Sequence, residues 1–185
     1  MRKLTVESDL PTGDPVAVVI LAAGRGSRLQ GRTDLVPKCL VEVAGQPMLS
    51  RMLNELEHLK VEHIVIVVGY LREKIKDHVA TFHPTLPITF VENSQYHETG
   101  SAKSLHLGLM VVPNSRHVLI VEADVVLEEG LCESVLKYCK KDIDAATLLA
   151  PYAPDLSGTF ALVYNNCVLA WCHESIRKPD FLLQK

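Results

Sequence analysis

The chain has 185 residues, with 19 basic and 22 acidic side chains and a formal net charge of −3, a length that favours one domain with a full hydrophobic core. The mildly acidic balance argues against a general nucleic-acid binder, and no apolar run is long enough to span a membrane. The five cysteines include no Cys-x-x-Cys pair and residues 1–15 lack the apolar core of a secretory signal, so we expect a cytoplasmic protein with reduced thiols and no zinc site.

Short apolar runs alternate with amphipathic segments along the chain. Residues 1–14 are polar and expected to be frayed, and residues 15–185 are expected to form one domain. The apolar runs predict strands at 16–23, 63–68, 88–92, 117–123 and 145–150. The helical periodicity predicts helices at 47–60, 71–82, 100–110 and 128–139. A hairpin is predicted where 158–164 and 167–171 flank Asn165-Asn166. This order predicts an α/β fold, a Rossmann-like three-layer sandwich with a mostly parallel central sheet.

The turn after the first predicted strand is rich in glycine and in positive charge. Gly24 and Gly26 allow a tight turn and a close approach to a ligand. The turn contains one acid, Asp34, against the cations Arg25, Arg28, Arg32 and Lys38. Exposed amides and fixed cations in such a turn favour phosphate binding. It is not a dinucleotide fingerprint, whose third glycine would fall at Leu29, and it lacks the Gly-Lys-Ser/Thr of a P-loop.

Three linked blocks extend this pattern: LAAGRGSRL at 21–29, PKCL at 37–40 and VAGQPM at 43–48. Together they resemble the signature of the nucleotidyltransferase family that makes nucleotide-activated sugars and alcohols. The resemblance implies an enzyme with the nucleotide-diphospho-sugar transferase fold. It implies that Arg28 binds the departing β and γ phosphates and that Lys38 meets the α-phosphate, as the catalytic residues. The nucleotide would also contact Leu21, Ala22, Ala23, Gly24, Arg25, Gly26 and Ser27.

A second informative stretch, at 91–105, leaves a predicted strand and enters a predicted helix through Thr-Gly-Ser-Ala. Its physical reading is a helix start with Thr99 or Ser101 as N-cap. Within the family it resembles the part that contacts the base and the acceptor, which implies nucleotide contacts at Asn93, Thr99, Gly100 and Ser101. The form Asn-x-x-Tyr-x-x-Thr-Gly is most similar to the branch that uses CTP with phosphocholine or aminoalkylphosphonates.

Asp124 ends the fourth predicted strand, where an acid is costly unless it is exposed, paired or bound to metal. Across the sheet edge from a phosphate loop it is a candidate Mg²⁺ ligand. The resemblance implies a second acid in a later strand, for which Glu174 and Asp180 are candidates only by elimination. It also implies further strands beyond the hairpin, so we expect the domain to be truncated at its C-terminus. Acceptor contacts are assigned to Glu98, in the stretch at 91–105, and to Tyr152 and Trp171, since aromatic rings can face an ammonium group.

The resemblance thus implies a CTP-dependent cytidylyltransferase that transfers CMP to phosphocholine, 2-aminoethylphosphonate or a similar small acceptor and releases pyrophosphate, with Mg²⁺ as cofactor. Its expected partners are CTP and the acceptor, with no nucleic acid and no membrane, and a homo-oligomer or a fused domain is left open. One alternative is a sugar-1-phosphate nucleotidyltransferase, which shares the first motif. Another is a non-catalytic subunit of the same fold that senses nucleotide.

Overall fold

The computed structural model describes residues 16–26, 31, 33–59, 61–112, 117–138, 145–149, 151, 159–165 and 167–173. The chain divides into two compact units, residues 1–143 and residues 144–185. Each unit is described by itself, and the single domain expected for 15–185 stays a prediction. Among the described helices none is both long and apolar enough to cross a membrane.

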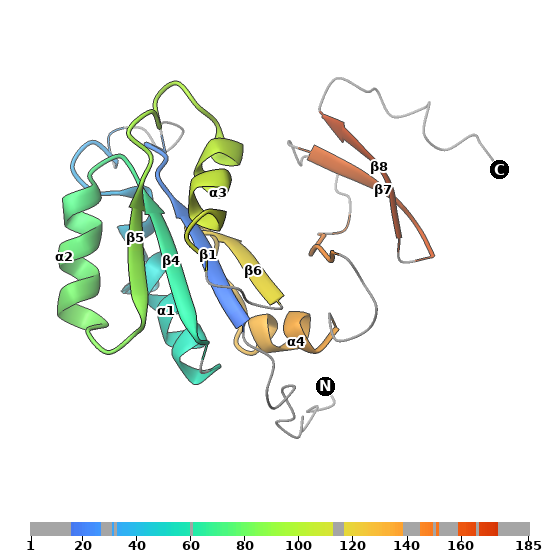
Figure 1. The fold of residues 1–185 in the computed structure, drawn as a ribbon, viewed down its shortest axis with the longest axis horizontal. Coiled ribbons are helices and arrows are strands. Elements are labelled where there is room, and N and C mark those ends of the chain that lie inside the picture. The colour runs from blue at the N-terminus through green and yellow to red at the C-terminus, as the bar shows by residue number, and fades with distance from the viewer. Residues whose placement is uncertain are drawn as a thin grey trace. The chain divides into compact units, whose positions relative to one another are not determined.

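The first unit is built on a four-stranded parallel sheet with the strand order β5-β4-β1-β6 (Figure 1). The strands are β1 (Val16–Ala22), β4 (His63–Val68), β5 (Ile88–Glu92) and β6 (His117–Glu122). Strands β1 and β4 are the central pair, and their apolar runs are almost wholly buried. A continuous β-branched run is expected for a parallel strand covered on both faces, and the predicted parallel α/β architecture is confirmed.

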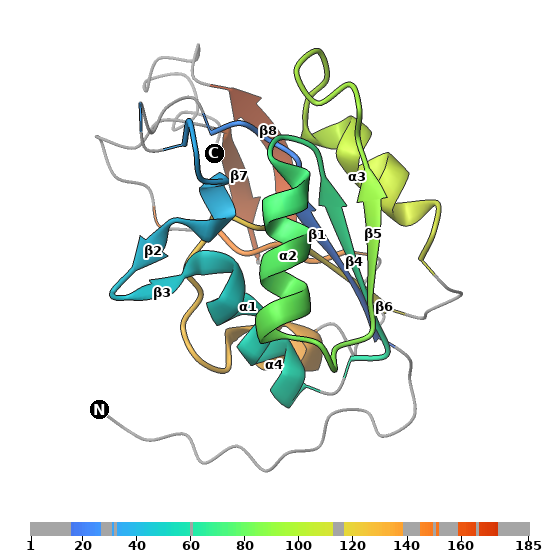
Figure 2. The ribbon, with the colours of Figure 1, turned by 90° about the vertical axis from the view of Figure 1, so that its left-hand side faces the viewer.

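Helices cover both faces of this sheet (Figures 1 and 2). The larger core packs α1 (Met48–His58) and α2 (Arg72–Phe82) on one face, with Cys132 of α4 (Leu131–Tyr138) joining it. On the other face, Leu105 of α3 (Ser101–Leu109) packs against Val19 and Val67. Helix α3 lies so close that a Cβ on Gly108 would stand 2.7 Å from Val19 Cγ1 and 2.9 Å from Val67 Cγ2. The glycine therefore permits the close approach of α3 to the sheet.

Three short elements between β1 and α1 had no counterpart in the sequence prediction. Residues Lys38–Leu40 form a single 3₁₀ turn, and β2 (Glu42–Val43) pairs antiparallel with β3 (Gln46–Pro47). Ala44 and Gly45 connect β2 to β3 with positive φ angles of 51° and 76°, as a tight hairpin turn requires. Strands of two residues are too short to show a hydrophobic period.

The second unit contains a hairpin of β7 (Thr159–Tyr164) and β8 (Cys167–His173), which confirms the predicted turn at Asn165. Asn165 has φ 47°, a conformation that asparagine tolerates. The strand predicted at 145–150 is wrong, because residues 145–149 form no strand in the structure. Those residues are exposed, and a strand needs a ladder partner for its backbone as well as an apolar sequence.

Candidate active site

Two cavities lie at the carboxyl ends of β1 and β6. The first cavity is lined by the glycine turn, the 3₁₀ turn and the end of β6: Leu21, Ala22, Gly24, Gly26, Lys38, Cys39, Glu122, Ala123 and Asp124. The second cavity is lined by the end of β1, the start of α3 and Glu122: Leu21, Ala23, Gly24, Tyr96, Thr99, Gly100, Ser101, Ser104 and Glu122. The carboxyl edge of a parallel sheet is where such folds bind ligands.

The two glycines of the turn have different roles. Gly26 has φ 70°, and a Cβ there would stand 2.9 Å from Cβ and Cδ of Lys38. It thus lets the lysine side chain lie against the turn. Gly24 would meet no atom within 4 Å, so its missing side chain leaves open space in both cavities. That space suits a ligand that contacts the backbone.

Lys38 and Asp124 meet in the first cavity as an ion pair, although 86 residues separate them in the sequence. The 3₁₀ turn positions Lys38 and the end of β6 positions Asp124. Each side chain is about one third exposed, at 31% and 32%, so both remain accessible to a ligand. Cys39 beside them is buried, and burial raises the pKa of its thiol to about 12. The thiol is therefore neutral and packs as an apolar group.

Glu122 lines both cavities, a position that the sequence prediction missed. Partial removal from water, the first cause, and the Asp124 charge raise the pKa of Glu122, while Lys38 opposes that rise. Glu122 looks in the sequence like an ordinary polar position of an edge strand. The signal that could have found it is its spacing of two residues from Asp124, which places both on one face of an extended chain.

The segment after β5 is organised by Asn93, which is 1% exposed. Its Nδ2 donates to Thr99 Oγ1 at 3.1 Å and to Ser104 Oγ at 3.0 Å, and its Oδ1 accepts from the Gln95 amide at 3.1 Å. Both of its N–H groups are thus used within the chain, and Asn93 lines neither cavity. Its side chain therefore shapes the wall of the second cavity.

Thr99, Gly100 and Ser101 line the second cavity, where they were predicted to contact nucleotide. The predicted N-cap is wrong, since α3 begins after Gly100 with no side-chain cap. Gly100 occupies the N-cap position, and the Thr99 hydroxyl before it donates to the Gln95 carbonyl at 2.8 Å and accepts from Asn93 Nδ2 at 3.1 Å.

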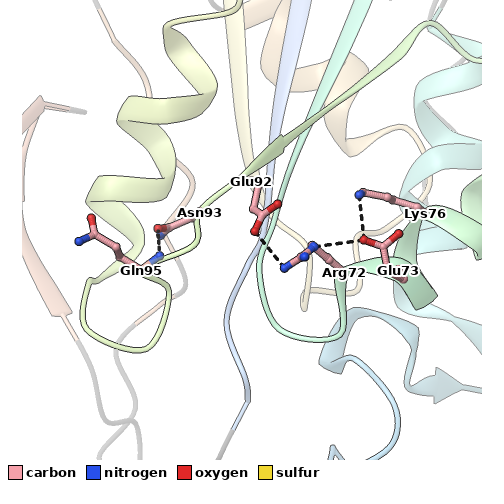
Figure 3. A network of polar contacts seen from close by, with 6 residues as sticks. All are labelled: Arg72, Glu73, Lys76, Glu92, Asn93 and Gln95. Carbon is pink, nitrogen blue, oxygen red and sulfur yellow. Dashed lines mark hydrogen bonds and ion pairs between the residues drawn. The ribbon is translucent and has the colours of Figure 1, made fainter.

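Figure 3 shows how the end of β5 is held from two sides. Glu92 pairs with Arg72 of α2 at 2.9 Å, and the next residue, Asn93, holds the turn at Gln95. Arg72 also contacts Glu73, which in turn pairs with Lys76 at 3.1 Å. These contacts fix the end of β5 relative to α2, so that the segment leading to α3 starts from a defined position.

The loop before Lys38 is tied to the start of α2. The Tyr70 hydroxyl donates to the Asp34 carbonyl at 3.0 Å, and Lys74 donates to the Leu35 carbonyl. Arg25 lies 5.5 Å from the Tyr70 ring centre and 3.6 Å from the Asp34 carboxylate. Arg25 therefore contacts its own loop and lines neither cavity.

Glu98 and Trp171 lie in different units of the chain. Glu98 is exposed, pairs with His97 at 3.2 Å and lines neither cavity. Trp171 lies on β8 in the second unit and is 56% exposed. Five predicted positions lie outside the described residues: Ser27, Arg28, Tyr152, Glu174 and Asp180.

Among the described residues, the Asp124 carboxylate is the candidate ligand for a divalent cation, and the Glu122 carboxylate lines the same cavity. The described residues contain no group of three or more His, Cys, Asp or Glu side chains placed to hold a metal. Mg²⁺ commonly binds through one or two carboxylates and completes its shell with waters and substrate phosphates. The donor set therefore fits Mg²⁺ bound together with a nucleotide, and does not fit a metal held by the protein alone.

A glycine turn on the first strand, with a lysine and a strand-end acid facing each other beside it, defines a nucleotidyltransferase-type α/β domain. Residues 18–170 match the model of the MobA-like NTP transferase domain, and the chain belongs to this family.

Three curated relatives show what this chain is similar to. It is 33% identical to the CMP-5′-(3-aminopropyl)phosphonate synthase of Streptomyces rubellomurinus, over 80% of this chain and 23% of that protein. It is 34% identical to the bifunctional protein GlmU of Psychrobacter arcticus, over 61% of this chain and 24% of that protein. It is 34% identical to the 2-aminoethylphosphonate cytidylyltransferase of Lancefieldella rimae, over 61% of this chain and 44% of that protein. The chain thus spans less than half the length of each of these relatives.

Two solved structures share the fold. The CTP:phosphocholine cytidylyltransferase of Streptococcus pneumoniae has a TM-score of 0.61 and 22% identity, over 85% of this chain and 64% of that one. The inositol-1-phosphate CTP transferase of T. maritima has a TM-score of 0.65 and 22% identity, over 86% of this chain and 64% of that one. At this identity the likeness establishes the architecture alone.

Proposed function

We propose that the chain transfers CMP from CTP to a small phosphorylated or phosphonylated alcohol or amine and releases pyrophosphate. The observation that carries this proposal is the meeting of Lys38 and Asp124 beside the glycine turn in the first cavity. The finer choice of CTP rests on the names of two relatives, a CMP-5′-(3-aminopropyl)phosphonate synthase and a 2-aminoethylphosphonate cytidylyltransferase.

In the proposed reaction an oxygen of the acceptor attacks the α-phosphorus in line. The new P–O bond forms while the bond from the α-phosphorus to the bridging oxygen breaks, and that oxygen leaves with pyrophosphate. Such a transfer asks little covalent chemistry of the protein, so positioning and charge stabilisation supply the catalysis. Lys38 would stabilise the charge that develops on the α-phosphoryl oxygens.

The nucleotide would contact the backbone of Leu21–Gly26 and the start of α3. Asp124 would hold Mg²⁺ together with phosphate oxygens, and the ion would supply neutralisation of the phosphate charge. Because Lys38 and Asp124 pair with each other in the free protein, binding would separate them and turn the lysine toward the phosphate. The pair keeps both charges compensated until that point.

Transfer to a sugar 1-phosphate is the second candidate function. It is favoured by the similarity to a UTP–glucose-1-phosphate uridylyltransferase, which is 29% identical over 88% of this chain. A nucleotide-sensing role without catalysis is the third, and the pairing of Lys38 with Asp124 beside the glycine turn favours catalysis over it.

The test is a titration of the protein with CTP, UTP, GTP and dTTP in Mg²⁺, followed by assay of pyrophosphate release. Phosphocholine, 2-aminoethylphosphonate and glucose 1-phosphate serve as acceptors. We expect the tightest binding for CTP, and pyrophosphate release with one of the first two acceptors. Preference for UTP together with glucose 1-phosphate would favour the sugar reading, and binding without release for any acceptor would favour the sensor.

A further inference from the structure

Glu122 lies on the α3 side of the sheet. Strand β6 pairs parallel with β1, and Glu122 is in register with Leu21. Neighbouring residues in register project to the same face of a sheet, and Leu21 belongs to the core on the α3 side. The flanking residues Val121 and Ala123 are buried in the opposite core, which places Glu122 beside Leu21.

Three residues line both cavities: Leu21, Gly24 and Glu122. Of these only Glu122 carries a polar side chain, and its carboxylate makes no hydrogen bond or ion pair with the part of the chain that the structure describes. An ionised carboxylate accepts hydrogen bonds and donates none. The boundary between the two cavities therefore presents a free acceptor.

We propose that Glu122 is a specificity-determining residue that accepts hydrogen bonds from the ribose hydroxyls of the nucleotide. This inference rests on the proposed function and adds to it that the phosphates occupy the first cavity, with Lys38 and Asp124, and that the base lies in the second. The sugar is the part of a nucleotide that joins base to phosphate, so it falls where the two cavities share residues.

The charge of Glu122 also fits a hydroxyl better than the neighbouring parts of the ligand. A carboxylate repels phosphate oxygens, whereas a sugar hydroxyl donates to it. A deoxy sugar would be costly, because the carboxylate would lose water when the nucleotide binds without gaining a partner. Hydrogen bonds to a charged group are stronger than those between neutral groups. Glu122 should therefore select ribonucleotides over deoxyribonucleotides.

The experiment measures by calorimetry, in Mg²⁺, the affinity of the whole chain for CTP, 2′-deoxy-CTP and 3′-deoxy-CTP. We expect the parent to bind CTP about tenfold or more tightly than at least one deoxy analogue, the factor typical of a charge-assisted hydrogen bond. In Glu122→Ala this ratio should fall to near one through weaker CTP binding. Glu122→Gln, with nearly the same shape and one acceptor oxygen, should give an intermediate ratio and checks against misfolding.

Glu129→Ala is the matched control, since Glu129 is an exposed acid that lines neither cavity. It should keep the parental ratio. Equal loss of affinity for CTP and both deoxy analogues in Glu122→Ala would overturn the inference, and a weaker Mg²⁺ dependence in that variant would make Glu122 a metal ligand instead. A changed CTP-to-UTP ratio with an unchanged deoxy ratio would place Glu122 at the base and overturn it too.

The outcomes separate this inference from the proposed function. If the parent prefers UTP to CTP, the assignment of CTP as substrate is wrong. The role of Glu122 is then tested by comparing UTP with its 2′-deoxy and 3′-deoxy analogues. If the parent binds CTP with no preference over either deoxy analogue, the cytidylyltransferase proposal stands and the role of Glu122 is wrong. If the parent binds no nucleoside triphosphate, both are overturned.

Discussion

Two opposite charges from distant parts of the chain define the site at the scale of single residues. Lys38 follows the glycine turn, Asp124 lies in the turn after β6, and the fold brings them into contact. In the free protein each is the nearest compensating charge of the other. In the proposed reaction Lys38 acts on the phosphates, so removing its charge should lower turnover more than it lowers the stability of the free protein.

Lys38→Ala is expected to lower turnover about 100- to 1,000-fold, the usual cost of removing one preorganised charge-stabilising group, with a smaller loss of CTP affinity. Pyrophosphate release and calorimetric titration measure the two effects. Lys76→Ala, which removes a lysine paired with Glu73 on the surface of α2, should leave both unchanged. A parental turnover in Lys38→Ala would remove Lys38 from the mechanism.

Asn93 provides a test of structural support. Asn93→Ala removes the donor to Thr99 and Ser104 and the acceptor of the Gln95 amide, and leaves buried polar groups unpaired. We expect the free energy of unfolding in urea to fall by about 1–3 kcal/mol, together with weaker nucleotide binding at the second cavity.

Gln95→Ala is the control for Asn93, because the bond to Gln95 uses only its backbone amide. It should leave stability within about 0.5 kcal/mol of the parent, as for most surface substitutions. If Asn93→Ala were as stable as Gln95→Ala and lost only nucleotide affinity, Asn93 would be a direct ligand.

At the scale of elements, α1 meets the end of α2 through a small polar cluster. The Ser50 hydroxyl lies 2.7 Å from His78 Nε2 and 3.3 Å from His83 Nε2. One hydroxyl can donate to one neutral ring and accept from the other. Burial is the first cause that lowers the pKa of both histidines, and for His78 the neighbouring His83 adds to it. Glu57 opposes the shift at His83.

This cluster predicts a loss of stability in mild acid. A histidine whose pKa is lower in the folded than in the unfolded chain is neutral in both states above the unfolded value of 6.5. Below that pH the unfolded chain binds protons first, so the free energy of unfolding falls as the pH drops from 6.5 toward the folded pKa. Urea unfolding at pH 7.5 and 5.5 measures this difference.

His78→Gln should reduce the pH dependence, whereas His58→Gln, at an exposed position near the end of α1, should keep it. An equal pH dependence in the parent and in His78→Gln would show that other groups govern the acid response. A rise in stability on acidification would contradict the sign of both shifts.

At the scale of the whole molecule, ligand binding should be visible as thermal stabilisation. A ligand that binds only the folded chain stabilises it by about 2.7 kcal/mol when its free concentration is 100 times the dissociation constant. For a chain of this size that corresponds to a rise in Tm of roughly 5–10 °C. We expect this rise with CTP and Mg²⁺ together, and a smaller one with CTP and a chelator.

Asp124→Asn should remove the Mg²⁺-dependent part of that rise while leaving the Tm of the free protein close to that of the parent. Asp124 is about one third exposed, and partly exposed ion pairs contribute about 1 kcal/mol or less to stability. A fall of many degrees in the free variant would instead make Asp124 structural and place the metal elsewhere.

The sequence alone determined the local features of this protein. The buried strands β1 and β4, the glycine turn after β1 and the hairpin at Asn165 all follow from residues adjacent in the chain, because hydrophobic period and turn chemistry are short-range properties. The parallel direction of the strands followed from the alternation of strands with helices, and the family followed from the linked motifs at 21–48.

The tertiary structure decided which side chains meet. The pairing of Lys38 with Asp124, the enclosure of Asn93 by Thr99 and Ser104, and the position of Glu122 between two cavities depend on register and on the packing of α3. The same dependence explains why residues 145–149 form no strand despite their apolar sequence. A sequence pattern fixes the face of an element, whereas contacts across the sheet are fixed only when the elements pack.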